Sequence, residues 1–251
     1  MKNQTKNNWT NEEIISWIKS QSGDAAFYQS IDLKDGIKIL GKVDTLQRIQ
    51  QMNLPSDFTG LSVLDVGCNS GSLCFETKKR GASKVVGIDV MDTRLFQART
   101  IAEILDLDID FKKMDLFTTQ DLGKFDIVFC IAVLTEVTDL IRGLEILKNL
   151  TKNTLYLEIA LSDTPCEKIL LNFIFLIRKV TNFFLLGNHS CKINENLGIA
   201  QLRRINSKTM KGWSLVPNRR FIDSIMSDSF FVTDLGQSQR YTLLKLVRKS
   251  K

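Results

Sequence analysis

A short motif in this sequence has the residue types of a nucleoside-binding turn. It reads Leu64-Asp-Val-Gly-Cys-Asn-Ser-Gly71, and Asp89 follows it in the chain. Glycine at positions 67 and 71 permits a tight turn and a close approach of the backbone to a ligand, because glycine has no Cβ. An acidic side chain roughly 20 positions after such a turn can accept hydrogen bonds from both hydroxyls of a ribose. The pattern predicts a site for an adenosine-containing cofactor.

The same motif lacks the features that bind phosphates. The dinucleotide fingerprint G-x-G-x-x-G requires its second glycine at the position where this chain has Asn69, so NAD and FAD fit poorly. No glycine-rich loop ends in Gly-Lys-Ser/Thr, so a P-loop is also missing from the sequence. The remaining class is an adenosine cofactor that carries a charged sulfonium group and no phosphates. Its positive charge would favour carbonyls and carboxylates around it.

The elements that must position these residues alternate between buried strands and helices. Helices are expected through Glu76 and Lys79, over 92–106 and over 139–150, and strands over 63–66, 84–89, 109–112, 125–130 and 154–158. This alternation predicts an α/β fold with a doubly wound, mostly parallel, Rossmann-like sheet. Ligands of such sheets bind beyond the carboxyl ends of the strands.

The chain divides into four parts around this pattern. An N-terminal helical or lid region precedes the cofactor-binding half, an inserted cap follows it, and the C-terminal end of the same domain completes the fold; these parts are residues 1–60, 61–161, 162–212 and 213–251. In the first part, Thr10 and Glu13 have the spacing of a capping box at the start of a helix. A second helix is expected from about Asp44 to before Pro55.

The inserted part contains an apolar stretch from Glu167 to Leu186 that is interrupted by polar residues. At helical spacing, the polar residues form one stripe: Lys168, Asn172, Lys179 and Asn182. A transmembrane helix needs about 20 mostly apolar residues. We therefore predict no transmembrane segment but an amphipathic helical cap over the sheet, with contact to a membrane surface as the alternative.

Charge and cysteine content narrow the classes of partner. The 251 residues carry a formal charge of +6, and residues 201–251 hold 11 lysines and arginines against three acids. Such a basic end suits a phosphate-bearing partner or RNA, although basic ends are also commonly just solvated.

Five cysteines without a CxxC pair and a single histidine, His189, predict neither a disulfide scaffold nor a zinc site. The polar start of the sequence predicts a cytoplasmic protein.

The motif from Asp65 to Gly71, together with Asp89, resembles that of the class I S-adenosylmethionine-dependent methyltransferases. Further segments are similar to the branch that contains the tRNA wobble-uridine (5-carboxymethoxyuridine-forming) methyltransferases: Tyr28 to Gly36, Gly41, Leu61 to Gly71 and Ala132-Val-Leu134. The resemblance covers roughly residues 27–160 and 213–235. It implies S-adenosyl-L-methionine, or its carboxylated form, as the cofactor, and a chemistry that requires no metal.

The resemblance also implies roles for individual residues. The resemblance implies that the loop of the motif surrounds the methionine moiety of the cofactor. It implies that Asp89 binds the ribose and Asp115 the adenine, and that the turn after the fourth strand borders the sulfonium and the acceptor. The cofactor-binding residues expected in this way are Asp65, Gly67, Cys68, Asn69, Gly71, Asp89, Asp115, Ala132 and Leu134.

The acceptor side departs from the wobble-uridine branch. Thr135-Glu136 stands where that branch has an aromatic residue and a histidine. Glu136 and Glu158 both lie near carboxyl ends of strands, and either is a candidate catalytic general base if burial raises its pKa. His189 in the inserted part is a further group that could reach the pocket.

Three functions remain open from the sequence. The first is methyl transfer to a small molecule such as a sugar or glycan intermediate, which we prefer. The second is modification of tRNA through the basic residues 201–251, and the third is a non-catalytic protein that keeps the fold for binding. The intact glycines at 67 and 71 with Asp89 disfavour the third. The sequence indicates neither the acceptor atom nor the oligomeric state.

Overall fold

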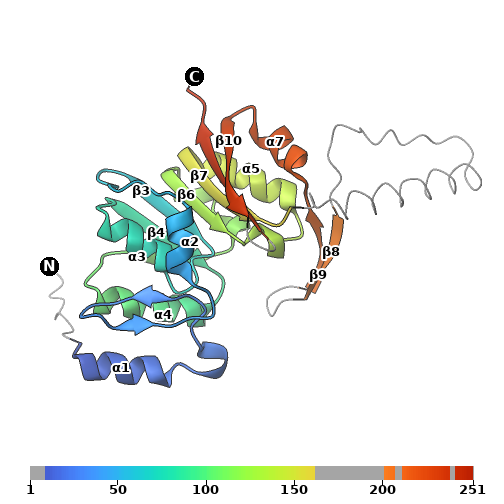
Figure 1. The fold of residues 1–251 in the computed structure, drawn as a ribbon. Coiled ribbons are helices and arrows are strands. Elements are labelled where there is room, and N and C mark those ends of the chain that lie inside the picture. Colours follow the sequence, from blue (N-terminus) through green and yellow to red (C-terminus); the bar gives the residue numbers. More distant parts are fainter. Residues whose placement is uncertain (1–8, 162–200, 207–210, 238–240, 251) are drawn as a thin grey trace, which may run out of the picture.

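The structure is a computed structural model that describes residues 9–161, 201–206, 211–237 and 241–250 (Figure 1). Its centre is a seven-stranded sheet in the order β10-β11-β7-β6-β3-β4-β5. The five strands from β3 to β7 run parallel, and β10 and β11 extend the sheet in antiparallel pairing. The strands are β3 (Ser62–Val66), β4 (Lys84–Asp89), β5 (Asp110–Lys113), β6 (Phe125–Ile131), β7 (Thr151–Ile159), β10 (Phe230–Gln237) and β11 (Thr242–Arg248). The predicted mostly parallel α/β sheet is confirmed.

Helices cover both faces of this sheet. Residues of α3 (Ser72–Lys79) and α4 (Asp92–Ile104) pack in one apolar cluster, and residues of α5 (Leu140–Leu150) and α7 (Arg219–Met226) pack in a second one. Strands β3, β4, β6, β7 and β11 supply side chains to both clusters, because successive residues point to opposite faces; in β3, Val63 belongs to the first and Leu64 to the second. Three short 3₁₀ turns, η2 (Leu116–Thr118), η3 (Gln120–Leu122) and η4 (Leu134–Glu136), follow β5 and β6.

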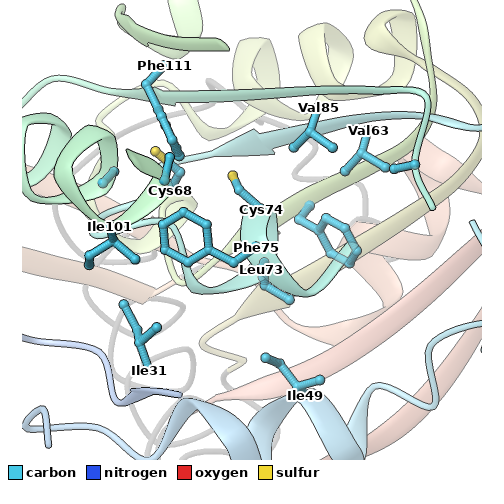
Figure 2. Packing of buried hydrophobic residues seen from close by; sticks show 14 of the residues in the cluster. Ile31, Ile49, Val63, Cys68, Leu73, Cys74, Phe75, Val85, Ile101 and Phe111 are labelled. Carbon is cyan, nitrogen blue, oxygen red and sulfur yellow. The ribbon is translucent and has the colours of Figure 1, made fainter. Parts of the chain in front are cut away.

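The N-terminal region belongs to the same core as the sheet. It contains α1 (Asn11–Ser20), η1 (Gly23–Ala25), the short strands β1 (Ile31–Asp32) and β2 (Lys38–Ile39), and α2 (Thr45–Gln51). The predicted capping box is present, since Thr10 and Glu13 bond each other's backbone N–H. Figure 2 shows Ile31 and Ile49 in one cluster with Leu73 and Val63. Residues 9–60 therefore extend the core of the sheet and do not form a separate core.

The expected cap is described only in part. The helix predicted from Glu167 to Leu186 lies outside the described residues, as does His189. Residues near the end of the expected helical insert form an antiparallel hairpin of β8 (Gln201–Asn206) and β9 (Lys211–Val216). The predicted helix itself is not tested by this pair of strands, and β9 lies next to η4. No helix in the described ranges has the length and apolar character needed to cross a bilayer.

The strand order places a crevice between β3 and β6. The chain moves outward from β3 through β4 to β5, then returns to form β6 on the other side of β3. The helices that follow these two strands belong to opposite apolar clusters, so the loops leaving β3 and β6 diverge at their carboxyl ends. Such a reversal point is where open α/β sheets bind ligands.

Candidate functional site

A cavity of about 560 Å³ opens at this reversal point. Its wall includes the ends of β3, β4 and β6, the turn after β5, and one side of α2. Seven of the residues expected at the site line it: Asp65, Gly67, Asn69, Asp89, Asp115, Ala132 and Glu136. The structure thus brings together side chains from four separate strand ends in one pocket.

The turn after β3 needs glycine at position 67. Gly67 has a φ of +72°, in the left-handed region that side chains with a Cβ disfavour. A Cβ built there would lie 2.3 Å from Cγ2 of Val133, which itself lines the cavity. The backbone N–H groups of Gly67 and Cys68 both donate to the carbonyl oxygen of Ile88, at 2.8 and 2.9 Å. These bonds tie the turn to the end of β4.

Asp89 holds two backbone segments at the rim of the cavity. Its Oδ2 accepts a hydrogen bond from the Asn69 N–H and its Oδ1 accepts one from the Met91 N–H, both at 2.9 Å. Burial raises the pKa of Asp89, while these backbone bonds oppose the rise. A carboxylate oxygen can accept more than one hydrogen bond, so both oxygens retain capacity for the two hydroxyls of a ribose.

Asp65 is the most deeply buried acid of the cavity wall, with 3% of its surface exposed. Burial raises its pKa to about 7; a hydrogen bond from the Cys74 thiol, 3.5 Å from Oδ2, opposes the rise, and the charge of Asp89 adds to it. A cationic group of a ligand beside Asp65 would favour the ionised form. The site therefore suits a ligand with a positive charge.

The raised pKa of Asp65 predicts a pH dependence of stability. In the unfolded chain this carboxyl ionises near its ordinary pKa of 3.8, whereas in the folded protein it keeps its proton up to about pH 7. We expect its contribution to the free energy of unfolding to be full below pH 4 and to fall by up to about 4 kcal/mol as the pH rises through 7. Urea unfolding of the unchanged protein and of Asp65→Asn at pH 5 and pH 7.5 measures this difference. Equal pH dependence of the two proteins would contradict it.

The end of β6 carries a backbone that is unusual for its residue type. Ala132 has a φ of +60° although it is not glycine, and its N–H donates to the carbonyl oxygen of Glu158 at 3.0 Å. Non-glycine residues in this region are commonly found where surrounding structure enforces them, often at functional sites. The strained turn directs the chain along the cavity from Ala132 to Glu136.

The two candidate general bases have different surroundings. Glu136 is partly exposed and lines the cavity. Glu158 is 4% exposed and does not line it; its Oε1 lies 3.4 Å from Nε of Arg48. Burial raises the pKa of Glu158 and the charge of Arg48 lowers it. Of the two, Glu136 lies at the cavity wall, where it could contact a ligand, and Glu158 lies behind Arg48.

Three of the expected cofactor-binding residues do not line the cavity: Cys68, Gly71 and Leu134. Cys68 is 1% exposed, and its side chain lies among apolar side chains near Cys74 and Phe111 (Figure 2). Gly71 caps the start of α3, and a Cβ there would lie 2.8 Å from Phe75. Leu134 is fully buried in the second cluster. Their positions follow from packing, which a sequence motif does not specify.

Sequence reasoning missed the side of the cavity formed by α2. Thr45, Arg48, Ile49 and Met52 line it there, together with Tyr28 and Gln29 from the preceding segment. Residues separated by three or four positions share one face of a helix, and Thr45, Arg48 and Ile49 of α2 follow that spacing, as does Met52 at its C-cap. The signal was present, but nothing in the sequence indicated which side of the helix faces the pocket.

A parallel doubly wound sheet with a glycine turn after its first strand and a carboxylate at the next strand end defines a nucleoside-binding α/β protein. A family model described as "Methyltransferase domain" matches residues 57–200, which is more than half of the chain. The chain belongs to this methyltransferase-domain family.

Curated relatives match over shorter stretches. A tRNA U34 carboxymethyltransferase of Campylobacter hominis is 33% identical over 94 residues, which cover 37% of this chain and 33% of that protein. A ubiquinone biosynthesis O-methyltransferase of Brucella anthropi is 36% identical over 88 residues, 35% of each chain. The match thus spans about a third of the length of these relatives.

Solved structures share the fold at low sequence identity. The N-terminal domain of EvdMO1, solved with SAH and D-fucose, aligns with a TM-score of 0.63 at 13% identity over 97% of this chain and 98% of that one. Magnesium protoporphyrin IX methyltransferase (ChlM) from Synechocystis PCC 6803, solved with SAM, aligns with a TM-score of 0.52 at 18% identity over 82% and 78%. At these identities the likeness concerns the fold.

Proposed function

We propose that this protein is an S-adenosyl-L-methionine-dependent methyltransferase. The carrying observation is the arrangement of Gly67 and Asp89 around one cavity: a left-handed glycine turn is hydrogen-bonded to a carboxylate-bearing strand end. In this proposal Asp89 binds the ribose hydroxyls and Asp115 the adenine amine. Asp65 and the Gly67–Asn69 turn lie at the positively charged methionine end.

The residues of the cavity suit methyl transfer without a metal. Bound S-adenosylmethionine supplies an electrophilic methyl group on a sulfonium. The turn from Ala132 to Glu136 borders this end of the cavity and would align the acceptor for in-line displacement; positioning of this kind contributes about 7–11 kcal/mol. Glu136 is the proposed general base that accepts the proton of an acceptor hydroxyl.

For the acceptor, we propose a small molecule such as a sugar or glycan intermediate. The support is the limited space for an acceptor: the cavity of about 560 Å³, in the range of small-molecule sites, has to hold the cofactor as well. The alignment with a domain solved with SAH and D-fucose agrees with an acceptor of this size.

Binding of the cofactor tests the proposed class directly. Calorimetry of the purified protein with S-adenosylhomocysteine should give a dissociation constant in the micromolar range or below. Mass spectrometry of any nucleoside that co-purifies distinguishes the ordinary from the carboxylated cofactor. No binding of S-adenosylhomocysteine by the folded protein would contradict the proposal. Binding without methyl transfer to any extract fraction would favour a non-catalytic role.

A second candidate is modification of tRNA, favoured by the match to a tRNA U34 carboxymethyltransferase and by the basic residues 201–251. Several of those basic groups have internal partners, however. Arg219 pairs with Asp223, Arg248 donates to the carbonyl of Thr151, and Lys249 donates to that of Ser227. Filter binding of unmodified tRNA at about 50 and 200 mM salt tests this candidate. Submicromolar, salt-sensitive binding with methyl or carboxymethyl transfer to the wobble uridine would favour it over the small molecule.

A further inference from the structure

We propose that Arg48, positioned by Glu158, binds an anionic group of the acceptor, a carboxylate or a phosphate. The inference rests on the proposed methyltransferase function and assigns a chemical class to the acceptor. The observation behind it is an ion pair between α2 and β7 of which only the cationic partner lines the cavity.

Arg48 is the only lysine or arginine among the described residues that line the cavity, whereas four carboxylates line it. Its Nε lies 3.4 Å from Oε1 of Glu158, and its side chain is 22% exposed. A guanidinium carries further N–H donors on its two terminal nitrogens. Within the described part of the chain, those nitrogens have no recorded acceptor, so they are available to a ligand in the cavity.

Glu158 fixes the direction of Arg48. Its side chain is 6% exposed, and Oε2 is buried without a hydrogen-bond partner among the described residues. Burying an ion pair costs desolvation energy that its own attraction often does not recover. An incompletely bonded, buried carboxylate is therefore poorly explained by stability alone. We infer that the role of Glu158 is to hold the guanidinium of Arg48 at the cavity wall.

The position of this pair along the sheet separates it from the proposed cofactor site. Asp89 is on β4 and the glycine turn follows β3, whereas Glu158 is on β7, beyond β6. Neighbouring strands lie about 4.8 Å apart, so β7 is about 10 Å from β3 and about 14 Å from β4. An adenosine held by Asp115 and Asp89 extends along β5 and β4. The Arg48 end of the cavity is then left for the acceptor.

Charge determines which acceptor fits this end. The acidic side chains at the cavity wall disfavour an anion, whereas the guanidinium of Arg48 attracts one. Arginine binds carboxylate and phosphate oxygens through charge-assisted hydrogen bonds. A carboxylate could come from the acceptor or from the methionine moiety of the cofactor. The experiment must therefore measure cofactor and acceptor binding separately.

Three hexoses that differ only at C6 serve as probes: D-glucose, D-glucuronate and D-glucose 6-phosphate. Their binding to the protein saturated with S-adenosylhomocysteine is measured by calorimetry for the unchanged protein, Arg48→Gln, Arg48→Lys and Glu158→Gln. We expect the unchanged protein to bind the two anions at least about tenfold more tightly than glucose. This preference should vanish in Arg48→Gln, persist in part in Arg48→Lys, and shrink in Glu158→Gln.

The affinity for S-adenosylhomocysteine, measured in the same variants, should stay within about threefold of the unchanged protein. A loss of about tenfold or more in Arg48→Gln would overturn the inference, because Arg48 would then serve the cofactor's carboxylate. Retained preference for anions in Arg48→Gln would overturn it too, as would no preference in the unchanged protein. Arg142→Gln, an exposed arginine on α5 outside the cavity wall, is the matched control. Failure of the unchanged protein to bind S-adenosylhomocysteine would instead refute the proposed function.

Discussion

Replacing Asp89 with alanine should weaken the binding of S-adenosylhomocysteine by about 2–4 kcal/mol, roughly 30- to 1000-fold. The expected loss has two sources. The carboxylate would no longer accept charge-assisted bonds from the ribose hydroxyls. The N–H groups of Asn69 and Met91, which it holds at 2.9 Å, would also lose their acceptor. Calorimetry with S-adenosylhomocysteine measures the change.

The matched control is Asp92→Ala. Asp92 is an exposed acid three residues further on, paired with Lys113, and it does not line the cavity. Its replacement should leave the affinity nearly unchanged. Circular dichroism verifies that both variants fold. An Asp89→Ala protein that is folded and binds S-adenosylhomocysteine as tightly as the unchanged protein would show that the ribose lies elsewhere.

Gly67→Val should reduce the affinity for S-adenosylhomocysteine by more than about 100-fold, about 3 kcal/mol. Valine is strongly disfavoured at a φ of +72°, and its Cβ would start 2.3 Å from Cγ2 of Val133. To remove this clash, either the turn at position 67 or Val133 has to move, and both line the cavity. The change therefore acts on the shape of the site and on the backbone N–H groups beside it.

Gly60→Val separates backbone strain from loss of the site. Gly60 has a φ of +78°, but a Cβ there would meet no atom within 4 Å. We expect Gly60→Val to lower stability through backbone strain, by less than Gly67→Val because it adds no clash, and to leave the affinity unchanged. Thermal unfolding and calorimetry of both variants give the comparison. If the two variants lost affinity equally, the effect of Gly67→Val would be one of general stability.

The local elements of the core could be predicted from sequence because their signals are local. Apolar runs such as Val63 to Val66 and the following glycine turn specify a buried strand and its end through burial and backbone freedom. The carboxyl ends of neighbouring parallel strands meet at one edge of a sheet. Asp65 and Asp89 could therefore be placed in one site without knowledge of any contact.

The tertiary structure decided which side chains face the cavity. Cys68 and Leu134 stand within or beside the predicted motifs, yet both are turned into apolar clusters. Arg48 and Glu158 lie on a helix and a strand far apart in sequence, and no local pattern relates them. Residues 201–206 pair with 211–216 as strands, for which the sequence analysis made no prediction.

The physical reason for this division is the range of the interactions involved. Hydrophobic periodicity, caps and glycine turns act within a few residues, so the sequence by itself determined the five parallel strands, the helices between them and the proposed cofactor-binding edge of the sheet. The direction of a side chain at a strand end depends on packing against elements distant in the chain. The proposed acceptor end of the cavity, with Arg48 held by Glu158 and with Glu136 at its wall, was therefore decided only by the tertiary structure.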